Sequence, residues 1–262
     1  MPKGLAPRPP LELIRFTGLR DQTVFERTGQ ENFKYVLDLG ALGPSGKILE
    51  VGSGCGKLAI PLTDYLGAEG TYEGFDIAKT GIDWCDRTIT PSYPNFRFRH
   101  FDIFNKKYNP SGRQRAAEFR FPFSDASFDL AVLFSVFTHM LPLDMGGFLG
   151  EIARVLKRGG KSVISYYLFD EKLLAEQIAG KENPFFHMMD DGKNIRLEFR
   201  HEFAPGCRIL SQELPELACA YEEQHILRVY QTHEMRIEKI HYGRWCGRPN
   251  PLSHQDLIVA MR

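Results

Sequence analysis

The stretch Glu50-Val51-Gly52-Ser53-Gly54-Cys55-Gly56 decides the fold class of this chain. It begins inside the short apolar run Lys47–Val51, whose length and composition predict a strand. The segment after it, Leu58–Leu66, carries its apolar residues on one helix face. Glycines between a strand and a helix let the backbone approach a ligand closely and adopt positive φ. The stretch therefore predicts a ligand-binding loop of the nucleotide type.

The spacing of the glycines argues against a dinucleotide ligand. In the dinucleotide fingerprint G-x-G-x-x-G the third glycine comes three residues after the second, and Lys57 occupies that place here. The third glycine, Gly56, comes one residue early, so the helix start is not spaced for a pyrophosphate. The acidic residue before the loop, Glu50, suits a ligand whose amino-acid end is positively charged. A nicotinamide oxidoreductase is thus a disfavoured alternative.

Two more acidic residues come at the ends of predicted strands. Thr71–Ile77 predicts a second strand with Asp76 near its end, and Phe96–Ile103 predicts a third with Asp102. A carboxylate at the second strand end can accept from both ribose hydroxyls of an adenosine, and one at the third from an adenine amino group. The competing interpretation of these acids, and of Glu50, is a solvated turn or a helix cap. Three acids at three successive strand ends are more specific than the glycine loop alone.

Strand and helix patterns alternate through the middle of the chain. Phe128–Phe134 is a continuous apolar run, typical of a strand covered on both faces. Lys161–Phe169 predicts a fifth strand after a helical stripe that ends at Leu156. Such alternation predicts an α/β fold with a parallel sheet and helices on both faces. The later patterns predict a hairpin around Ala204-Pro205-Gly206, a helix over Pro215–Tyr230, and two closing strands, Arg236–Tyr242 and Asp256–Met261.

These segments together resemble a class I S-adenosylmethionine-dependent methyltransferase of the small-molecule branch. The resemblance spans roughly Lys47 to Phe169, and Arg236–Met261 fits the last two strands. The segments that carry it are ILEVGSGCG (48–56), YEGFDI (72–77), FRHFDI (98–103), FPFSDASFDLAVLFSVFTHM (121–140) and EIARVLKRGGKSVIS (151–165). These motifs are specific for the cofactor and not for the methyl acceptor.

The resemblance implies a Rossmann-like, mostly parallel sheet of seven strands in the order 3-2-1-4-5-7-6, with strand 7 antiparallel and helices on both faces. It implies one methyltransferase domain over residues 1–262, with an N-terminal helical cap (1–45), a cofactor-binding core (46–169), a lid or substrate insertion (170–232) and closing strands (233–262). The implied cofactor is S-adenosyl-L-methionine, held by Glu50, Gly52, Ser53, Gly54, Asp76, Ile77, Asp102, Ile103, Ser135 and Phe137.

The sequence signals for the methyl acceptor are less specific than those for the cofactor. A hydroxyl acceptor usually needs a general base, and His139, just past the fourth strand, has an ordinary pKa near neutrality. The alternative is that His139 shapes the loop or contacts the cofactor, and Phe137 is expected against the cofactor or, alternatively, in the core. One of Tyr166 and Tyr167 is expected to face the acceptor pocket, because strand side chains alternate. Phe185, Phe186, Met188 and Met189 suit an apolar pocket, a plain core or a dimer contact.

Composition narrows the class of protein. The 33 Lys and Arg residues balance 33 Asp and Glu, which argues against a nucleic acid partner bound through bulk charge. There is no apolar run of membrane-spanning length and no signal peptide, and five cysteines without a CxxC pair favour a cytoplasmic protein without a metal site. We expect a monomer or homodimer that methylates a small-molecule hydroxyl, natural-product or sugar-like. The alternatives are an N- or C-methyltransferase and a non-catalytic cofactor-binding module.

Overall fold

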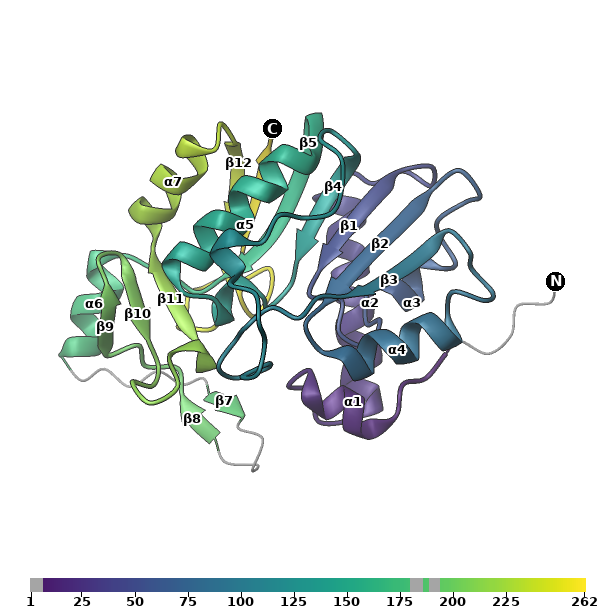
Figure 1. Cartoon of the computed structure of the whole chain (residues 1–262). Helices are drawn as coiled ribbons and strands as arrows, with labels where there is room; N and C mark the ends of the chain where they lie inside the picture. Colours follow the sequence, from purple (N-terminus) through teal and green to yellow (C-terminus); the bar gives the residue numbers. More distant parts are fainter. Residues whose placement is uncertain (1–6, 180–185, 189–193) are drawn as a thin grey trace.

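The computed structural model describes residues 7–179, 186–188 and 194–262 (Figure 1). The helices are α1 (Leu11–Phe16), α2 (Gln22–Asp38), α3 (Ala59–Leu62), α4 (Lys79–Thr88), α5 (Pro142–Val155), α6 (Glu171–Ile178) and α7 (Glu223–Thr232), with short 3₁₀ helices η1 (Ala116–Glu118), η2 (Phe137–His139) and η3 (Pro215–Leu217). The strands are β1 (Lys47–Val51), β2 (Thr71–Asp76), β3 (Phe96–His100), β4 (Phe128–Leu133), β5 (Leu156–Tyr166), β6 (Leu168–Phe169), β7 (Phe186–Met188), β8 (Asn194–Arg196), β9 (His201–Ala204), β10 (Cys207–Ile209), β11 (Cys219–Glu222), β12 (Arg236–His241) and β13 (Asp256–Met261).

The main sheet has seven strands in the order β12-β13-β5-β4-β1-β2-β3. The pairs from β3 through β5 are parallel, and β13 is antiparallel to both β5 and β12. Because β12 and β13 are the sixth and seventh strands of this sheet along the chain, the order 3-2-1-4-5-7-6 with an antiparallel seventh strand is confirmed. Parallel neighbours bring the carboxyl ends of β1, β2, β3 and β4 to one edge, where ligands of such sheets bind.

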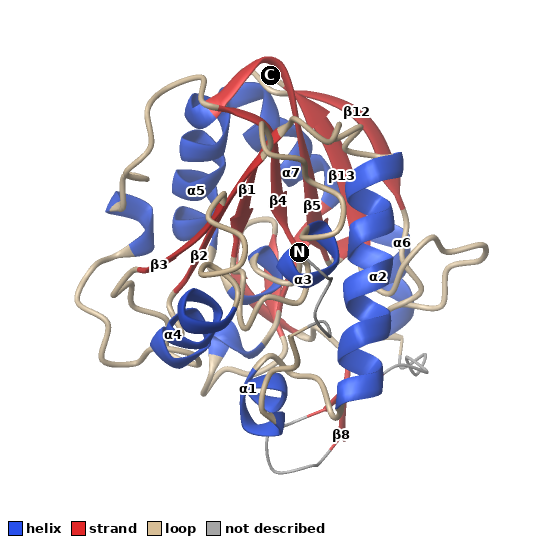
Figure 2. Ribbon diagram, turned by 90° about the vertical axis from the view of Figure 1, so that its right-hand side faces the viewer, coloured by secondary structure: helices blue, strands red, loops and turns tan. Residues whose placement is uncertain are grey.

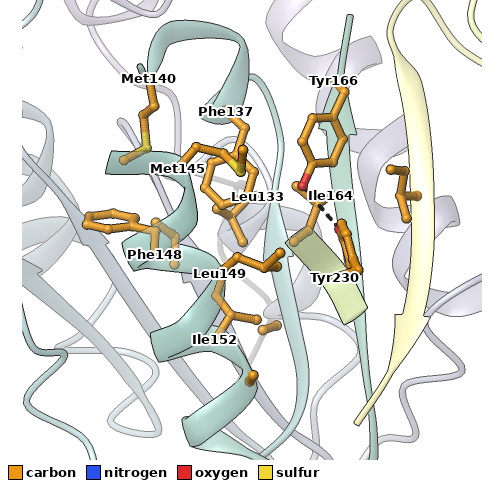
Figure 3. Packing of buried hydrophobic residues seen from close by; sticks show 14 of the residues in the cluster. Leu133, Phe137, Met140, Met145, Phe148, Leu149, Ile152, Ile164, Tyr166 and Tyr230 are labelled. Carbon is orange, nitrogen blue, oxygen red and sulfur yellow. Dashed lines mark hydrogen bonds between the residues drawn. The ribbon is translucent and has the colours of Figure 1, made fainter. Parts of the chain in front are cut away.

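Helices cover both faces of the main sheet, as the alternating pattern predicts. Along β4, Leu130 and Val132 pack into the core beneath α2, α3 and α4, whereas Ala131 and Leu133 pack into the core beneath α5 and α7. Figure 2 shows the sheet between α5 on one side and α2 on the other, and Figure 3 shows the packing of the α5 side, including Phe137 and Tyr166. The site at the sheet edge thus rests on a rigid, doubly covered support.

A second sheet corrects two predictions for the chain after β5. Its four strands run in the order β6-β11-β10-β9, and Figure 1 shows β9, β10 and β11 near α6 and α7. The predicted helix over Pro215–Tyr230 is wrong in its first part, because Pro215–Leu217 forms only the 3₁₀ turn η3, Cys219–Glu222 forms β11, and the α-helix begins at Glu223. The period-3.6 pattern misled because β11 is buried in the sheet interior, where packing overrides helical periodicity.

The predicted strand Lys161–Phe169 is likewise divided. Strand β5 ends at Tyr166, and Leu168–Phe169 leaves the main sheet to pair in parallel with β11. The predicted hairpin around Ala204-Pro205-Gly206 is confirmed, as β9 pairs antiparallel with β10. Phe185 and Met189 lie outside the described residues, and so do the side chains of Phe186 and Met188. No helix in the described ranges combines the length and the apolar character needed to cross a lipid bilayer.

Candidate functional site

A pocket of about 1100 Å³, counted with its open mouth, lies at the carboxyl ends of β1 to β4. The glycine loop and residues after β2, β3 and β4 form its floor, and residues of α1, of the loop after β3 and of the start of α5 form its walls. Of the residues predicted to hold the cofactor, Glu50, Gly52, Ser53, Gly54, Asp76, Ile77, Ile103 and Ser135 line this pocket, and so does His139. The fold therefore gathers most of the predicted site in one place.

The glycine loop is pinned against the end of β2. Gly52, Gly54 and Gly56 all have positive φ, at 80°, 54° and 82°. The amides of Gly52 and Ser53 donate to the carbonyl of Phe75 at 2.8 and 3.1 Å. A Cβ on Gly52 would lie 2.4 Å from a methyl group of Val136, so only glycine fits between the two loops. The loop leaves a backbone-walled cradle at the pocket floor.

Asp76 both holds the loop and lines the pocket. Its Oδ2 accepts from the Gly54 amide and its Oδ1 from the Ala78 amide, each at 2.7 Å. Burial raises the pKa of Asp76, and these backbone hydrogen bonds act in the opposite direction. Each carboxylate oxygen offers about two lone pairs, so each keeps one for a ligand hydroxyl. The turn-capping interpretation and the ligand interpretation of Asp76 thus both describe its geometry.

Glu50 and Lys57 both line the pocket, and each carries a charge that shifts the pKa of the other. Glu50 is 2% exposed, and the hydroxyl of Tyr72 donates to its Oε2. Burial raises the pKa of Glu50 to about 7, although the hydrogen bond from Tyr72 and the charge of Lys57 lower it. Burial lowers the pKa of Lys57, which Glu50 partly offsets. A positively charged ligand group beside the buried carboxylate would stabilise its charged form.

His139 lies on η2 with its two ring nitrogens held by different elements. Its Nδ1 is 3.1 Å from the carbonyl oxygen of Glu216, and its Nε2 is 3.4 Å from the hydroxyl of Tyr108. The side-chain amide of Asn105 also donates to the carbonyl of His139 at 2.9 Å. The imidazole is therefore oriented from two sides, by η3 and by the loop after β3.

Two predicted cofactor contacts do not reach the pocket. The carboxylate of Asp102 accepts from Asn109 at 3.1 Å and from Arg113 at 2.7 Å, outside the lining of the pocket. Arg113 holds the pKa of Asp102 below its ordinary value. Phe137 is fully buried and packs on Tyr166 with ring centroids 5.5 Å apart. Its place is the hydrophobic core, the alternative that the sequence left open.

Neither Tyr166 nor Tyr167 lines the pocket, which corrects the expectation that one of them faces the acceptor. Tyr166 is fully buried with its hydroxyl 3.1 Å from that of Tyr230, a contact drawn in Figure 3. Tyr167 packs on Trp245 at 5.1 Å between ring centroids. The two side chains do alternate, but the second sheet and the loop after β12 cover the faces that each of them meets.

A family model described as "Methyltransferase domain" matches residues 49–164, which run from β1 into β5 and contain the pocket floor. The chain contains a methyltransferase domain of the class I S-adenosylmethionine-dependent type. Its cofactor is accordingly S-adenosylmethionine. Within the described residues, no group of three or more His, Cys, Asp and Glu side chains is placed to hold a metal ion.

The methyltransferase also resembles solved structures. An S-adenosylmethionine-dependent methyltransferase from Mesorhizobium loti is 15% identical over 88% of this chain and 96% of its own, with a TM-score of 0.57. The complex of the Haloferax volcanii Trm112 activator and the putative methyltransferase contains a chain that matches at 14% identity over 94% and 93%, with a TM-score of 0.56. The [4+2]-cyclase SpnF matches at 14% over 92% and 82%, with a TM-score of 0.55. Identities this low establish the shared fold only.

The pocket of the methyltransferase fits its cofactor. Gly52, Ser53 and Gly54 line the pocket, and the two glycines present backbone without a side chain to a ligand there. Asp76 keeps acceptor capacity for two hydroxyl groups, and Glu50 offers a dry carboxylate for an ammonium. We propose that Glu50, Gly52, Ser53 and Gly54 hold the amino-acid end, with Asp76 on the ribose and Ile77 and Ile103 beside the base.

We expect the affinity for S-adenosylhomocysteine to fall when the pH is lowered from about 8 to about 6. Glu50, with a pKa of about 7, takes up a proton in this range and no longer offers a negative charge to the ammonium group of the ligand. The loss approaches about tenfold per pH unit below that pKa. Calorimetric titrations across the range measure it, with Glu50→Gln as the variant whose affinity should stay nearly flat.

The stability of the free methyltransferase should depend on Glu50 with the opposite sign. Its folded pKa of about 7 lies above the ordinary value of 4.5. The contribution of Glu50 to folding is therefore fully present below the ordinary pKa and is lost as the pH rises through about 7.

For ligand binding, a wild-type affinity that does not change between about pH 6 and about pH 8 contradicts the assignment of Glu50 to the ammonium.

Several pocket residues carry no motif in the sequence. Phe16 and Thr17 come from the end of α1, Asn105 and Tyr108 from the loop after β3, and Asp144 from the first turn of α5. The rings of Phe16 and Tyr108 meet edge to face at 5.8 Å, although 92 residues separate them. No local pattern signals such a contact, because it depends on how α1 and the loop dock on the sheet edge.

Proposed function

We propose that the methyltransferase transfers a methyl group to a hydroxyl oxygen of a small-molecule acceptor, with His139 as the general base. The observation that carries the proposal is the position of the imidazole. It lines the pocket, and a carbonyl oxygen lies 3.1 Å from its Nδ1.

The contact with Glu216 selects one tautomer of His139. A carbonyl oxygen only accepts, so Nδ1 must carry the proton and donate it. The other nitrogen, Nε2, then has a lone pair, which the Tyr108 hydroxyl meets at 3.4 Å. A neutral imidazole with a fixed Nδ1–H is the state that a general base needs, because Nε2 is then a proton acceptor, and an acceptor hydroxyl that takes the place of the Tyr108 hydroxyl passes its proton to it.

The remaining side chains align the reactants and keep water out. The bound cofactor supplies the methyl group and a neutral sulfur leaving group. The edge-to-face contact of Phe16 and Tyr108 joins α1 to the loop after β3 across the pocket wall. The hydroxyl of Ser135 donates to Gln255 at 3.0 Å and ties the loop after β4 to the loop before β13. Holding two reactants in line supplies much of the rate enhancement of a displacement reaction.

The walls of the pocket favour an acceptor with an apolar body. Phe16 is 45% exposed and Phe104 43% exposed, and both line the pocket, as does Met140. Of the two acceptor types expected from the sequence, this lining suits a natural product better than a sugar-like molecule.

The contacts of residues 170–232, which follow β5, support their interpretation as a lid or substrate insertion. From it, η3 reaches the pocket region: the Glu216 carbonyl meets His139, and the Glu216 carboxylate accepts from the Lys106 amide at 3.4 Å. We propose that the insertion organises the acceptor side of a single domain. The cytoplasmic location, the monomer or homodimer, and the absence of a nucleic acid partner remain predictions.

Transfer of a radiolabelled methyl group to matched acceptors tests the proposed function. Each pair of acceptors shares one apolar aromatic skeleton and differs only in bearing a hydroxyl or an amino group. We expect labelled product from the hydroxyl member. Label that enters only amino members or ring carbons would show an N- or C-methyltransferase. Tight binding of S-adenosylhomocysteine with no labelled product across the panel would contradict the hydroxyl acceptor.

A further inference from the structure

Among the described residues, three carboxylates line the pocket, and they come from successive parts of its wall. They belong to Glu50 on β1, Asp76 at the end of β2 and Asp144 in the first turn of α5. S-adenosylmethionine has three groups that donate hydrogen bonds: the ammonium, the ribose hydroxyls and the adenine amino group. Glu50 is assigned to the ammonium and Asp76 to the ribose hydroxyls. Asp144 is therefore the carboxylate that remains for the adenine amino group.

Asp102, the acid expected at the adenine from the sequence, is committed elsewhere. Both of its oxygens have partners in the loop after β3, Oδ1 with Asn109 and Oδ2 with Arg113. The Arg113 side chain is 87% exposed, so the pair faces solvent. The amides of Arg113 and Gln114 donate to the Asp102 carbonyl, both at 3.0 Å, which adds to the hold of this loop on Asp102. The acid therefore shapes the loop.

Asp144 lies where the loop after β3 meets α5. Its Oδ1 accepts from the Ala117 amide of η1 at 2.9 Å. Its Oδ2 has no hydrogen-bond partner among the residues that the structure describes. Burial raises the pKa of Asp144, as expected of a carboxylate that has lost water without gaining enough donors. A partly buried carboxylate with one oxygen open to a pocket is a specific acceptor for a ligand N–H.

The Ala117 amide joins Asp144 to η1, which follows β3 along the chain. Phe75, Ile103, Ala116 and Phe148 contribute apolar side chains to the lining of the same pocket. Because β1, β2 and β3 are neighbours in that order, Glu50, Asp76 and Ile103 follow one another across the pocket. The ligand parts must follow the same order, so the base reaches the wall where Asp144 stands.

We propose that Asp144, and not Asp102, accepts the hydrogen bond from the adenine amino group and so makes the pocket specific for adenine. The Ala117 amide positions the carboxylate by occupying one of its oxygens, and the apolar wall around it excludes competing water. The proposal requires only that the cofactor binds, and it is independent of the acceptor.

Calorimetric affinities for S-adenosylhomocysteine and S-inosylhomocysteine test the proposal. The inosyl compound has a carbonyl oxygen in place of the amino group, so a carboxylate would face an acceptor. We expect the wild type to prefer the adenosyl compound by about 10- to 100-fold. In Asp144→Asn an amide can donate to that carbonyl, so the preference should fall to within about threefold.

Asp102→Asn is the matched control, and it should keep the wild-type preference. A folding defect lowers both affinities together, whereas the preference is a ratio and changes only when the base is read differently. If Asp144→Asn does not yield folded protein, Asp144→Ser is measured in the same way. The proposal is overturned if the wild type shows no preference, if the Asp144 variant keeps it, or if the Asp102 variant loses it as fully.

Discussion

His139→Ala is expected to lower the turnover number by about 10²- to 10⁴-fold, the range that general base catalysis supplies. The affinity for S-adenosylhomocysteine should change less than about threefold, because the proposed role of the imidazole is to take the proton of the acceptor. Single-turnover transfer of a labelled methyl group and calorimetry on the same preparation separate the two quantities. The matched control is His241→Ala, which removes a histidine on the edge strand β12, outside the pocket lining, and should leave both unchanged.

Added imidazole provides a second measurement for the role of His139. A small base that enters the space left by the ring should restore part of the turnover of His139→Ala and none in the control. Equal losses of turnover and of cofactor affinity would instead make His139 a cofactor contact, the alternative that the sequence left open. Loss of turnover without any rescue, together with a lowered melting temperature, would point to a structural role.

Asp256→Ala is expected to lower the free energy of unfolding by about 3–5 kcal/mol, the cost of breaking a buried charged pair by removing one partner. The carboxylate is fully buried and accepts four hydrogen bonds. Its Oδ2 accepts from the Leu168 amide at 2.7 Å and the Trp245 indole at 2.6 Å. Its Oδ1 accepts from the Gly243 amide at 2.7 Å and from Arg248 at 3.0 Å. Alanine leaves all four donors without this acceptor, and the three from Leu168, Gly243 and Trp245 are buried.

The four donors explain why a fully buried acid is kept at this position. Burial raises the pKa of Asp256 to about 6, and the charge of Arg248 and the hydrogen bonds offset part of that cost. The network fixes the loop between β12 and β13, whose Gln255 holds Ser135 at the pocket. Urea unfolding measures the loss. Asp129→Ala, at an exposed ion pair with Lys157, serves as the control and should cost about 0–1 kcal/mol. A loss within that range for Asp256→Ala contradicts the network.

His139 and Asp256 differ in how far the sequence predicts their roles. His139 stands beside a recognisable strand-end segment, so its place near the cofactor was predictable. Asp256 stands at the start of a predicted strand, where nothing in the local sequence distinguishes a buried hub from a solvated turn. One of its four partners lies in β6 and the other three in the loop after β12, and only the docking of these segments creates the network.

Local sequence patterns predicted the parallel sheet and the floor of the pocket, and the family resemblance implied the strand order. The patterns are apolar runs of strand length, glycines between a strand and a helix, and acids at strand ends, each readable within a few residues. Long-range packing, in contrast, sets which acids remain available to a ligand. Asp102 accepts a hydrogen bond from Arg113, and Phe137 lies in the hydrophobic core. Asp144 and Tyr108 line the pocket from a helix and a loop that no sequence motif marks. The physical reason is that a side chain satisfies its hydrogen bonds and burial with whichever neighbour packing brings nearest, and long-range packing leaves little trace in a local pattern.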